Sequence, residues 1–389
     1  MKMKKLLAIL AALAALQFSA WAVGPAGSDG APVPAGPEVR AKAALLMEKT
    51  TGEILYESNA RAVLAPASVT KVMTLLLIQE ALDEGTIGKE TRVPVSAAAA
   101  GMGGSQVYLK EREELTVHEM LKAIAVASAN DACVAMAEYL AGSEAAFVER
   151  MNARAAELGM EDTVFRNCTG LPAEGHHTSA RDIALMSRAL ILDHPDIRTY
   201  TGIWIDSLRD GTFQLSNTNK LIRFYPGATG LKTGSTDAAL YCLSATAERE
   251  GMELIAVILG APTSQDRFNG ARDLLNYGFS GWALVTPAPS EPLPPVAVDL
   301  GTRRTVRPVP EGSDPLLLPR ADAGKVTTAL DLPDQVPAPV EAGQTLGSLT
   351  VLVDGKEKAR IPLTAEEAVP RLSPWQVFRG LLSALLLGP

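Results

Sequence analysis

The stretch that decides the fold runs from Leu64 to Leu82 and has the sequence LAPASVTKVMTLLLIQEAL. It predicts a core helix from Ser68 to Leu82, because apolar residues recur at helical spacing over a broad face, namely Val72, Met73, Leu75, Leu76, Ile78 and Leu82. Ser68 and Lys71 stand one helical turn apart at the head of this helix. Their side chains therefore emerge on one face, about 5–6 Å apart at Cβ.

That spacing suits nucleophilic catalysis. A serine hydroxyl is a poor nucleophile until a base removes its proton, and a neutral lysine beside it can take that proton. The pKa of Lys71 has to fall for this role, which burial and a second cation both promote, and Lys232 is the candidate for that cation. Taken alone, the pair is more typical of a helix-capping serine and a solvated lysine.

Two further stretches change that interpretation. AVASANDACVAMAEYL places Ser128 and Asn130 within an apolar helical region, where polar groups cost free energy unless they are paired. GATGLKTGST places Lys232, Thr233 and Gly234 on an expected strand, and a glycine there permits close approach of a ligand to the backbone. The structural alternatives are a helix N-cap in the first stretch and a hairpin turn in the second.

The remaining pattern predicts an α+β fold. A hairpin is expected around residues 50–53, helices over 117–140 and 144–158, and another helix after an N-cap at Ser179. Three strands follow in GLKTGST, LYCLSATAE and MELIAVILGAP, and then a last helix in QDRFNGARDLLNYGFSG. Strands at both ends of a helical middle predict an antiparallel sheet covered by helices.

Composition divides the chain into segments. Lysines, an apolar run and an Ala-Trp-Ala site near the start predict a secretory signal peptide, and Pro-rich stretches predict flexible links. The expected segments are a signal peptide at 1–22, a flexible lead-in at 23–40, a catalytic domain at 41–284, a Pro-rich linker at 285–295, a small all-β domain at 296–368 and an amphipathic C-terminal helix at 373–389.

Charge and cysteine content exclude several function classes. The net charge of −8 argues against a nucleic-acid partner, because phosphate recognition needs a basic face. Cys133, Cys168 and Cys242 are widely spaced and odd in number, so we expect small buried hydrophobic residues and not a disulfide framework. No metal or cofactor is implied, because the histidines are too scattered for a zinc site and are expected to be solvated or in loops, namely His118, His176, His177 and His194.

The three motifs together resemble a known set. Ser-x-x-Lys, then Ser-x-Asn, then Lys-Thr-Gly, in this order, is shared by penicillin-binding proteins and serine β-lactamases. The resemblance is closest to the serine-type D-alanyl-D-alanine carboxypeptidases, the low-molecular-mass penicillin-binding proteins. It extends over about residues 41–281 through AKAALLMEKTTGEILYESNARAVLAPASVTKVMTLLL, SANDACVAMAE, GLKTGSTDAA and IAVILGAPTSQDRF. PVEAGQTLGSLTVLVDGKEKARIPL resembles the β domain that follows the catalytic domain in that family.

The resemblance implies roles for the motif residues. Ser68 is expected to be the nucleophile, Lys71 the general base and Ser128 a proton relay, with Asn130 bonded to Lys71 and the substrate amide. Lys232, Thr233, Gly234 and Ser235 are expected to form the substrate-binding strand. The backbone N–H groups of Ser68 and Ser235 are expected to form the oxyanion hole.

The implied substrate is a peptidoglycan stem peptide that ends in D-alanyl-D-alanine, and the implied inhibitors are β-lactam antibiotics. A DD-endopeptidase, a β-lactamase and a non-catalytic wall-binding protein are the alternatives. A β-lactamase of the first class needs a glutamate that activates the deacylating water. Glu157 and Glu161 lie in the relevant interval, but they lack the expected Glu-x-x-x-Asn spacing.

The C-terminal stretch SPWQVFRGLLSALLLGP predicts an amphipathic helix with a narrow polar wedge at Gln376, Arg379, Gly380 and Ser383. Such a helix lies in a membrane interface more readily than it spans the membrane. We therefore expect an extracytoplasmic protein bound to the outer face of the cytoplasmic membrane. A helix docked on the protein's own core is the alternative.

Overall fold

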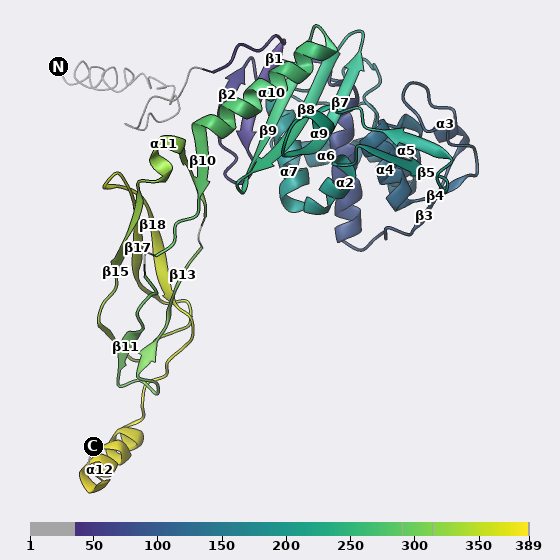
Figure 1. Cartoon of the computed structure of the whole chain (residues 1–389). Coiled ribbons are helices and arrows are strands. Elements are labelled where there is room, and N and C mark those ends of the chain that lie inside the picture. The colour runs from purple at the N-terminus through teal and green to yellow at the C-terminus, as the bar shows by residue number, and fades with distance from the viewer. Residues whose placement is uncertain (1–35, 290, 313, 388–389) are drawn as a thin grey trace, which may run out of the picture. The chain divides into compact units, whose positions relative to one another are not determined.

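The computed structural model describes residues 36–289, 291–312 and 314–387 (Figure 1). The expected signal peptide and nearly all of the expected lead-in lie outside these residues.

A five-stranded sheet lies at the centre of the N-terminal part of the described chain. Its strands lie in the order β2-β1-β9-β8-β7, and every neighbouring pair is antiparallel. Their bounds are β1 Ala43–Glu48, β2 Ile54–Ser58, β7 Ala228–Thr236, β8 Leu240–Arg249 and β9 Met252–Ala261. The antiparallel sheet and the first hairpin are confirmed. Two segments about 200 residues apart in sequence thus pair directly, since β1 lies between β2 and β9.

Helices cover both faces of this sheet. Side chains alternate between the faces of a strand, so Leu45 of β1 joins the core beneath the helical middle of the chain, whereas Leu46 packs against α10. Helix α10, Ser264–Gly281, follows β9 and runs along the second face (Figure 1). The first face packs against α7 Ala180–Asp193 and α2 Lys71–Asp83. The core on this side also includes residues of α4 Val117–Ala127, α5 Asn130–Ala141 and α6 Glu144–Glu157.

Two of the helix predictions need correction. Helix α2 starts at Lys71, and the residues before it form the 3-10 turn η1, Ala67–Thr70. The single helix predicted over 117–140 is two helices, because Ser128 takes a left-handed backbone with φ 63° that ends α4 before α5 begins. Helical periodicity continues across this break, which explains why the sequence pattern did not reveal it. The predicted N-cap at Ser179 is confirmed, since its side chain accepts from the backbone N–H of Asp182.

Shorter elements connect these helices and strands. They are β3 Arg92–Pro94, α3 Ala97–Ala100, β4 Glu114–Thr116, η2 Pro195–Ile197, α8 Arg198–Thr201, β5 Ile205–Leu208, β6 Phe213–Ser216 and α9 Leu221–Phe224. The hairpin of β5 and β6 lies directly before the segment that leads into β7.

The C-terminal part of the chain is built mainly from strands and has a separate small core. Its strands are β10 Trp282–Val285, β11 Val296–Asp299, β12 Thr305–Val306, β13 Pro308–Pro310, β14 Leu316–Pro319, β15 Val326–Asp331, β16 Gln335–Pro337, β17 Thr345–Val353 and β18 Lys356–Ala365, with the one-turn helix α11 Arg320–Ala323. Val296, Val340 and Val369 are among the residues of the small core. Helix α12, Pro374–Leu387, follows.

Helix α10 fits against the sheet because glycine allows a close approach. A Cβ at Gly278 would lie 2.4 Å from Cδ1 of Leu254 and 2.9 Å from Cδ2 of Leu46, whereas a Cβ at Gly281 would meet nothing within 4 Å. We expect Gly278→Ala to destabilise the fold by about 1–3 kcal/mol through overpacking. Gly281→Ala, on the same helix, should change stability by less than about 0.5 kcal/mol. Urea unfolding of both variants checks this, and equal midpoints would contradict the packing argument.

Candidate active site

Ser68 lies in a turn that the neighbouring loop holds tightly. Ala67, just before it, has φ 48°, a left-handed conformation that a residue with a Cβ rarely adopts. Thr70 Oγ1 donates to Ala67 O over 2.9 Å, and a Cβ at Gly170 would lie 1.9 Å from the same oxygen. Ser68 makes no N-cap hydrogen bond, so it is not the helix-capping serine of the structural alternative.

Lys71 is fully buried and its Nζ reaches three oxygens. Nζ lies 3.0 Å from Ser68 Oγ, 2.7 Å from Asn130 Oδ1 and 2.7 Å from Thr169 O. The expected pairing of serine and lysine is therefore present in the structure, and the alternative of a solvated lysine is wrong. Burial lowers the pKa of Lys71, because the charged form loses its hydration.

Lys232 is the second buried cation of the site. It is 1% exposed and donates to Thr233 O over 2.9 Å. Burial and, next, repulsion from Lys71 hold the pKa of Lys232 well below its usual value. The sequence predicted Lys232 as the second cation that lowers the pKa of Lys71. The repulsion between the two lysines lowers the pKa of Lys232, whereas the pKa of Lys71 is lowered by burial. Burial is the dominant effect on each of them.

The break between α4 and α5 presents Ser128 and Asn130 to the site. Both side chains are almost fully buried, and the Ser128 hydroxyl makes no hydrogen bond to any other residue in the described part of the chain. Asn130 Nδ2 donates to Gly103 O over 2.7 Å while its oxygen accepts from Lys71. Asp131 accepts from the backbone N–H groups of Val107 and Leu109, so this corner also fixes the loop before β4.

Strand β7 passes directly beside the serine turn. A Cβ at Gly234 would lie 2.8 Å from the backbone nitrogen of Ser68 and 2.9 Å from that of Val69. The predicted close approach to Gly234 is therefore made by the chain's own nucleophile turn. Thr233 Oγ1 donates to Thr218 Oγ1 over 2.7 Å, and Ser235 is exposed.

Arg267 lies beside the site although no sequence pattern indicates it. Its guanidinium, on α10, donates to Gly234 O over 3.2 Å and to Cys242 O over 3.3 Å, and it lies over the rings of Tyr241 and Phe268. Burial lowers its pKa to about 10, and its Nε has no hydrogen-bond partner among the described residues. It supplies a further positive charge beside the Lys-Thr-Gly strand. No local pattern in QDRFNGARD marks it.

His176, which the sequence predicted to be solvated or in a loop, lies in a loop but is almost fully buried. The Arg166 backbone N–H donates to His176 Nδ1 over 3.0 Å, so Nε2 carries the proton and donates to Thr70 Oγ1 over 2.9 Å. Thr70 in turn holds the carbonyl of Ala67, next to Ser68. A chain of hydrogen bonds thus connects the loop around His176 to the nucleophile turn. Burial lowers the pKa of His176 to about 4.

The three cysteines are free and buried, as the sequence predicted. Burial raises the pKa of Cys133 to about 12 and that of Cys242 to about 11, and it raises the pKa of Cys168 well above the usual value. All three are therefore thiols at neutral pH. Among residues 36–289, 291–312 and 314–387, no group of three or more His, Cys, Asp or Glu side chains lies close enough to hold a metal ion.

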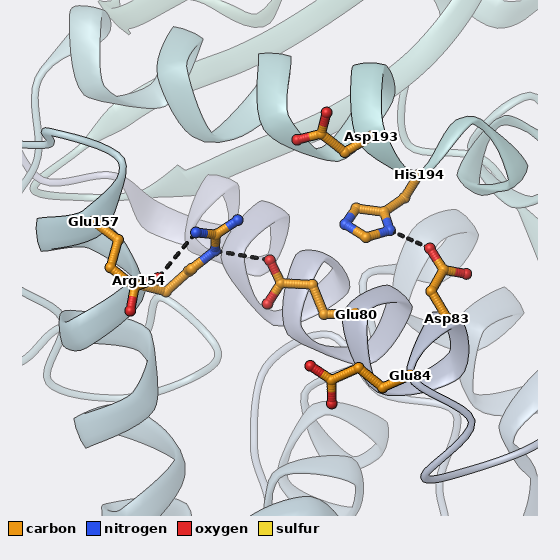
Figure 2. Close-up of a pocket in the computed structure, with 7 residues that line it drawn as sticks. All are labelled: Glu80, Asp83, Glu84, Arg154, Glu157, Asp193 and His194. Atoms are coloured by element: carbon orange, nitrogen blue, oxygen red, sulfur yellow. Dashed lines mark hydrogen bonds and ion pairs between the residues drawn. The ribbon is translucent and has the colours of Figure 1, made fainter.

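A second, acidic hollow lies at the far end of α2. Figure 2 shows its carboxylates on α2 and α6 and at the end of α7, with Arg154 between Glu80 and Glu157. His194 pairs there with Asp83. Glu80 is nine residues beyond Lys71, about 13 Å along the helix at 1.5 Å per residue. This hollow is therefore separate from the serine site.

The antiparallel sheet, the buried Ser-x-x-Lys turn, the Ser-x-Asn corner and the Lys-Thr-Gly strand define the class of serine penicillin-binding proteins and serine β-lactamases. Within that class, residues 31–263 match the D-alanyl-D-alanine carboxypeptidase family, and residues 291–371 match the penicillin-binding protein 5 C-terminal domain. The chain belongs to the D-alanyl-D-alanine carboxypeptidase family.

Curated relatives agree with this assignment. The chain is 44% identical over 332 residues to the D-alanyl-D-alanine carboxypeptidase DacF of Bacillus subtilis, covering 84% of this chain and 85% of that protein. It is 34% identical over 347 residues to DacC of Escherichia coli, covering 86% and 85% of the two chains. It is thus a serine hydrolase of the penicillin-binding type that acts as a D-alanyl-D-alanine carboxypeptidase.

Solved structures agree as well. Penicillin-binding protein 5 from Haemophilus influenzae superimposes with a TM-score of 0.72 at 27% identity, covering 88% of this chain and all of that one. Penicillin-binding protein D2 from Listeria monocytogenes, in its ampicillin-bound form, gives a TM-score of 0.57 at 33% identity, covering 62% of this chain and 98% of that one.

The depressed pKa of His176 predicts a pH effect on stability. The pKa of an unfolded histidine is about 6.5, whereas burial lowers the pKa of His176 in the fold to about 4. Between these pH values the unfolded chain binds the extra proton, so stability is lost as the pH falls through this window. His176→Gln removes that dependence, which amounts to at most about 3 kcal/mol.

The measurement is urea unfolding at neutral pH and near pH 4.5, on wild type and His176→Gln. The variant should lose less stability on acidification than wild type. His177→Gln is the matched control and should retain the wild-type dependence. Equal acid sensitivity of wild type and His176→Gln would contradict the assignment of this buried neutral histidine.

Proposed function

We propose that the chain removes the terminal D-alanine from peptidoglycan stem pentapeptides through an acyl-enzyme on Ser68. The observation that carries this proposal is the 3.0 Å approach of Nζ of the fully buried Lys71 to Oγ of the partly buried Ser68. The hydroxyl oxygen attacks the carbonyl carbon of the penultimate D-alanine, and its proton passes to Lys71.

The hydrogen bonds around Lys71 favour the base role. The oxygens of Asn130 and Thr169 are carbonyl acceptors, so each needs a proton from Nζ. A neutral amine has two N–H groups and one lone pair. When the two N–H groups serve these carbonyls, the lone pair remains for the Ser68 hydroxyl. The low pKa that burial gives Lys71 makes this neutral form accessible.

Ser128 completes the proton transfer. As the peptide bond breaks, the leaving amine of D-alanine needs a proton, and Lys71 now holds one. The Ser128 hydroxyl, which has no other protein partner among the described residues, relays it from Lys71 to the amine. Asn130 orients Lys71 and forms a hydrogen bond with the substrate amide. Water then attacks the ester carbon, with Lys71 again as base, and releases the shortened peptide.

The other motif residues bind the negatively charged groups of the substrate and of the tetrahedral intermediate. The terminal carboxylate of the substrate is recognised by the Thr233 and Ser235 hydroxyls in the field of Lys232 and Arg267. The backbone N–H groups of Ser68 and Ser235 stabilise the oxyanion that forms on the attacked carbonyl. The close approach of Gly234 to Ser68 supports this pairing of turn and strand.

Slow hydrolysis of the β-lactam acyl-enzyme is part of the proposal. Glu157 pairs with Arg154 in the acidic hollow at the far end of α2 (Figure 2). Glu161 pairs with Arg61. Their side chains are 63% and 67% exposed. Neither arrangement supports a water-activating role beside Ser68, so a β-lactamase is disfavoured.

We expect wild type to gain the mass of one benzylpenicillin and Ser68→Ala to gain none, as measured by intact mass spectrometry. Lys71→Gln should be acylated about 10²–10⁴-fold more slowly, because no base then takes the hydroxyl proton. Release of D-alanine from a defined pentapeptide should fall in parallel.

The surface lysine Lys89, which pairs with Asp196, gives the matched control, and Lys89→Gln should react like wild type. Circular dichroism establishes that each variant is folded. An adduct on Ser68→Ala would show that another residue is the nucleophile, and full activity of Lys71→Gln would remove the lysine from the base role.

Location and domain organisation form the second part of the proposal. The segments are the signal peptide at 1–22, the lead-in at 23–40, the catalytic domain at 41–284, the linker at 285–295, the β domain at 296–368 and the anchor helix at 373–389. We place the mature protein outside the cytoplasmic membrane, with α12 in the outer interface. No helix among the described residues combines the length and apolar character needed to cross a bilayer.

The side chains of α12 support interfacial binding. Its large apolar residues are exposed to between 44% and 83%, namely Trp375, Phe378, Leu381, Leu382, Leu385 and Leu386. Burying such side chains stabilises by about 1.5–3 kcal/mol each, which exceeds the cost of ordering the helix. Their exposure disfavours the alternative of a helix docked on the core.

Removal of the chain from Ser373 onward should leave pentapeptide hydrolysis unchanged and abolish sedimentation with lipid vesicles. The physical reason is that the exposed apolar face of α12 is lost while the catalytic residues keep their contacts. Sedimentation and D-alanine release are measured on the same samples. A truncated chain that unfolds would place α12 in the protein core, contrary to the proposal.

A further inference from the structure

A basic loop of the β domain is joined to the chain just before α12. Leu372 N donates to Leu300 O over 2.8 Å and Thr302 N donates to Pro370 O over 2.8 Å. Gly301 and Arg371 form the bridge between these bonds. The loop from 300 to 304 is therefore fixed beside the segment 370–372 by backbone hydrogen bonds, independently of how α12 is oriented.

The side chains of this loop point to an anionic partner. Arg303, Arg304 and Arg371 are exposed. Arg303 pairs with Glu367, but in the described part of the chain neither Arg304 nor Arg371 has a side-chain hydrogen bond or ion pair. Leu300 is 42% exposed and takes φ 55°. Two unpaired guanidinium groups thus accompany an exposed apolar side chain.

Chain connectivity places this loop close to the start of the anchor helix. Arg371 precedes Pro374, the first residue of α12, by three residues, which span at most about 11 Å. Attraction between charges in salt solution extends over about 8 Å. When α12 lies in the interface, the long side chains of Arg371 and Arg304 therefore reach the lipid headgroups.

We propose that Leu300, Arg304 and Arg371 form a second membrane contact that binds the headgroups of anionic phospholipids. The proposal rests on the interfacial position proposed for α12. The guanidinium groups contact lipid phosphate, and Leu300 enters the headgroup region. The nearby carboxylates reduce the net charge, but Glu367 and Glu366 are already paired with Arg303 and Arg307, so Asp299 is the carboxylate that offsets part of the attraction.

The test compares vesicles of phosphatidylcholine with vesicles that also contain phosphatidylglycerol, using the full mature chain. Wild type should prefer the anionic vesicles. The partition coefficient of Arg304→Gln/Arg371→Gln on these vesicles should be about 10- to 25-fold lower than that of wild type. Each arginine contributes about fivefold, and Asp299 offsets part of this effect. Binding to phosphatidylcholine should stay unchanged. Pentapeptide hydrolysis serves as the folding control, since neither arginine belongs to the active site.

The matched control is Lys358→Gln/Arg360→Gln on β18. It removes the same charge near the start of this strand, whereas residue 366 follows the end of the strand. It should keep the wild-type preference. Equal losses in both double variants, or no loss in Arg304→Gln/Arg371→Gln, would overturn the proposal.

The anchor helix is tested separately with chains cut before Ser373, with and without the two arginine changes. If α12 is not an anchor, the cut leaves binding intact. If the two arginine changes still weaken vesicle binding of the cut chain, the loop proposal is supported even in that case. If the cut abolishes binding but the two arginine changes have no effect in the full chain, the anchor proposal is supported and the loop proposal is wrong.

Discussion

The need to satisfy one buried amine governs the architecture of the catalytic part. Lys71 is fully buried, and its Nζ has to find oxygen partners, because an unpaired buried amine is costly. The partners come from three separate segments, at Ser68, Asn130 and Thr169. Each segment is fixed in turn by helix α2, by the break between α4 and α5, and by the loop that packs on the nucleophile turn. The same contacts that stabilise the fold therefore prepare the serine for reaction.

Backbone proximity is the second requirement of this site. Gly170 and Gly234 bring two chain segments within van der Waals distance of the nucleophile turn, where any side chain would collide with main-chain atoms. The left-handed conformation of Ala67 is held by the hydrogen bond from Thr70 and by the contact at Gly170. Strain near the reacting group is thus maintained by packing from outside the turn. The order of the active site depends on the order of its surroundings.

The sequence predicted the main elements and the motif residues but not the residues that support them. Periodicity and turn residues identified the first hairpin, the last three strands of the sheet and most helices, because these signals are local. The helix break at Ser128 escaped, since apolar spacing continues across it. His176 and Arg267 act on residues 106 and 33 positions away, at Thr70 and Gly234, so no local pattern reveals them. Burial changes their chemistry only after the chain has folded.

The buried cysteines have a consequence for the compartment in which such an enzyme works. Cys133, Cys168 and Cys242 remain unpaired. Burial raises the pKa of Cys133 to about 12, that of Cys242 to about 11 and that of Cys168 well above its usual value. Thiol exchange and oxidation proceed through the thiolate and require access to it. Neither condition is met in the native fold. The folded protein therefore tolerates an oxidising environment without disulfide bonds, and its exposure to thiol damage is confined to the time before folding is complete.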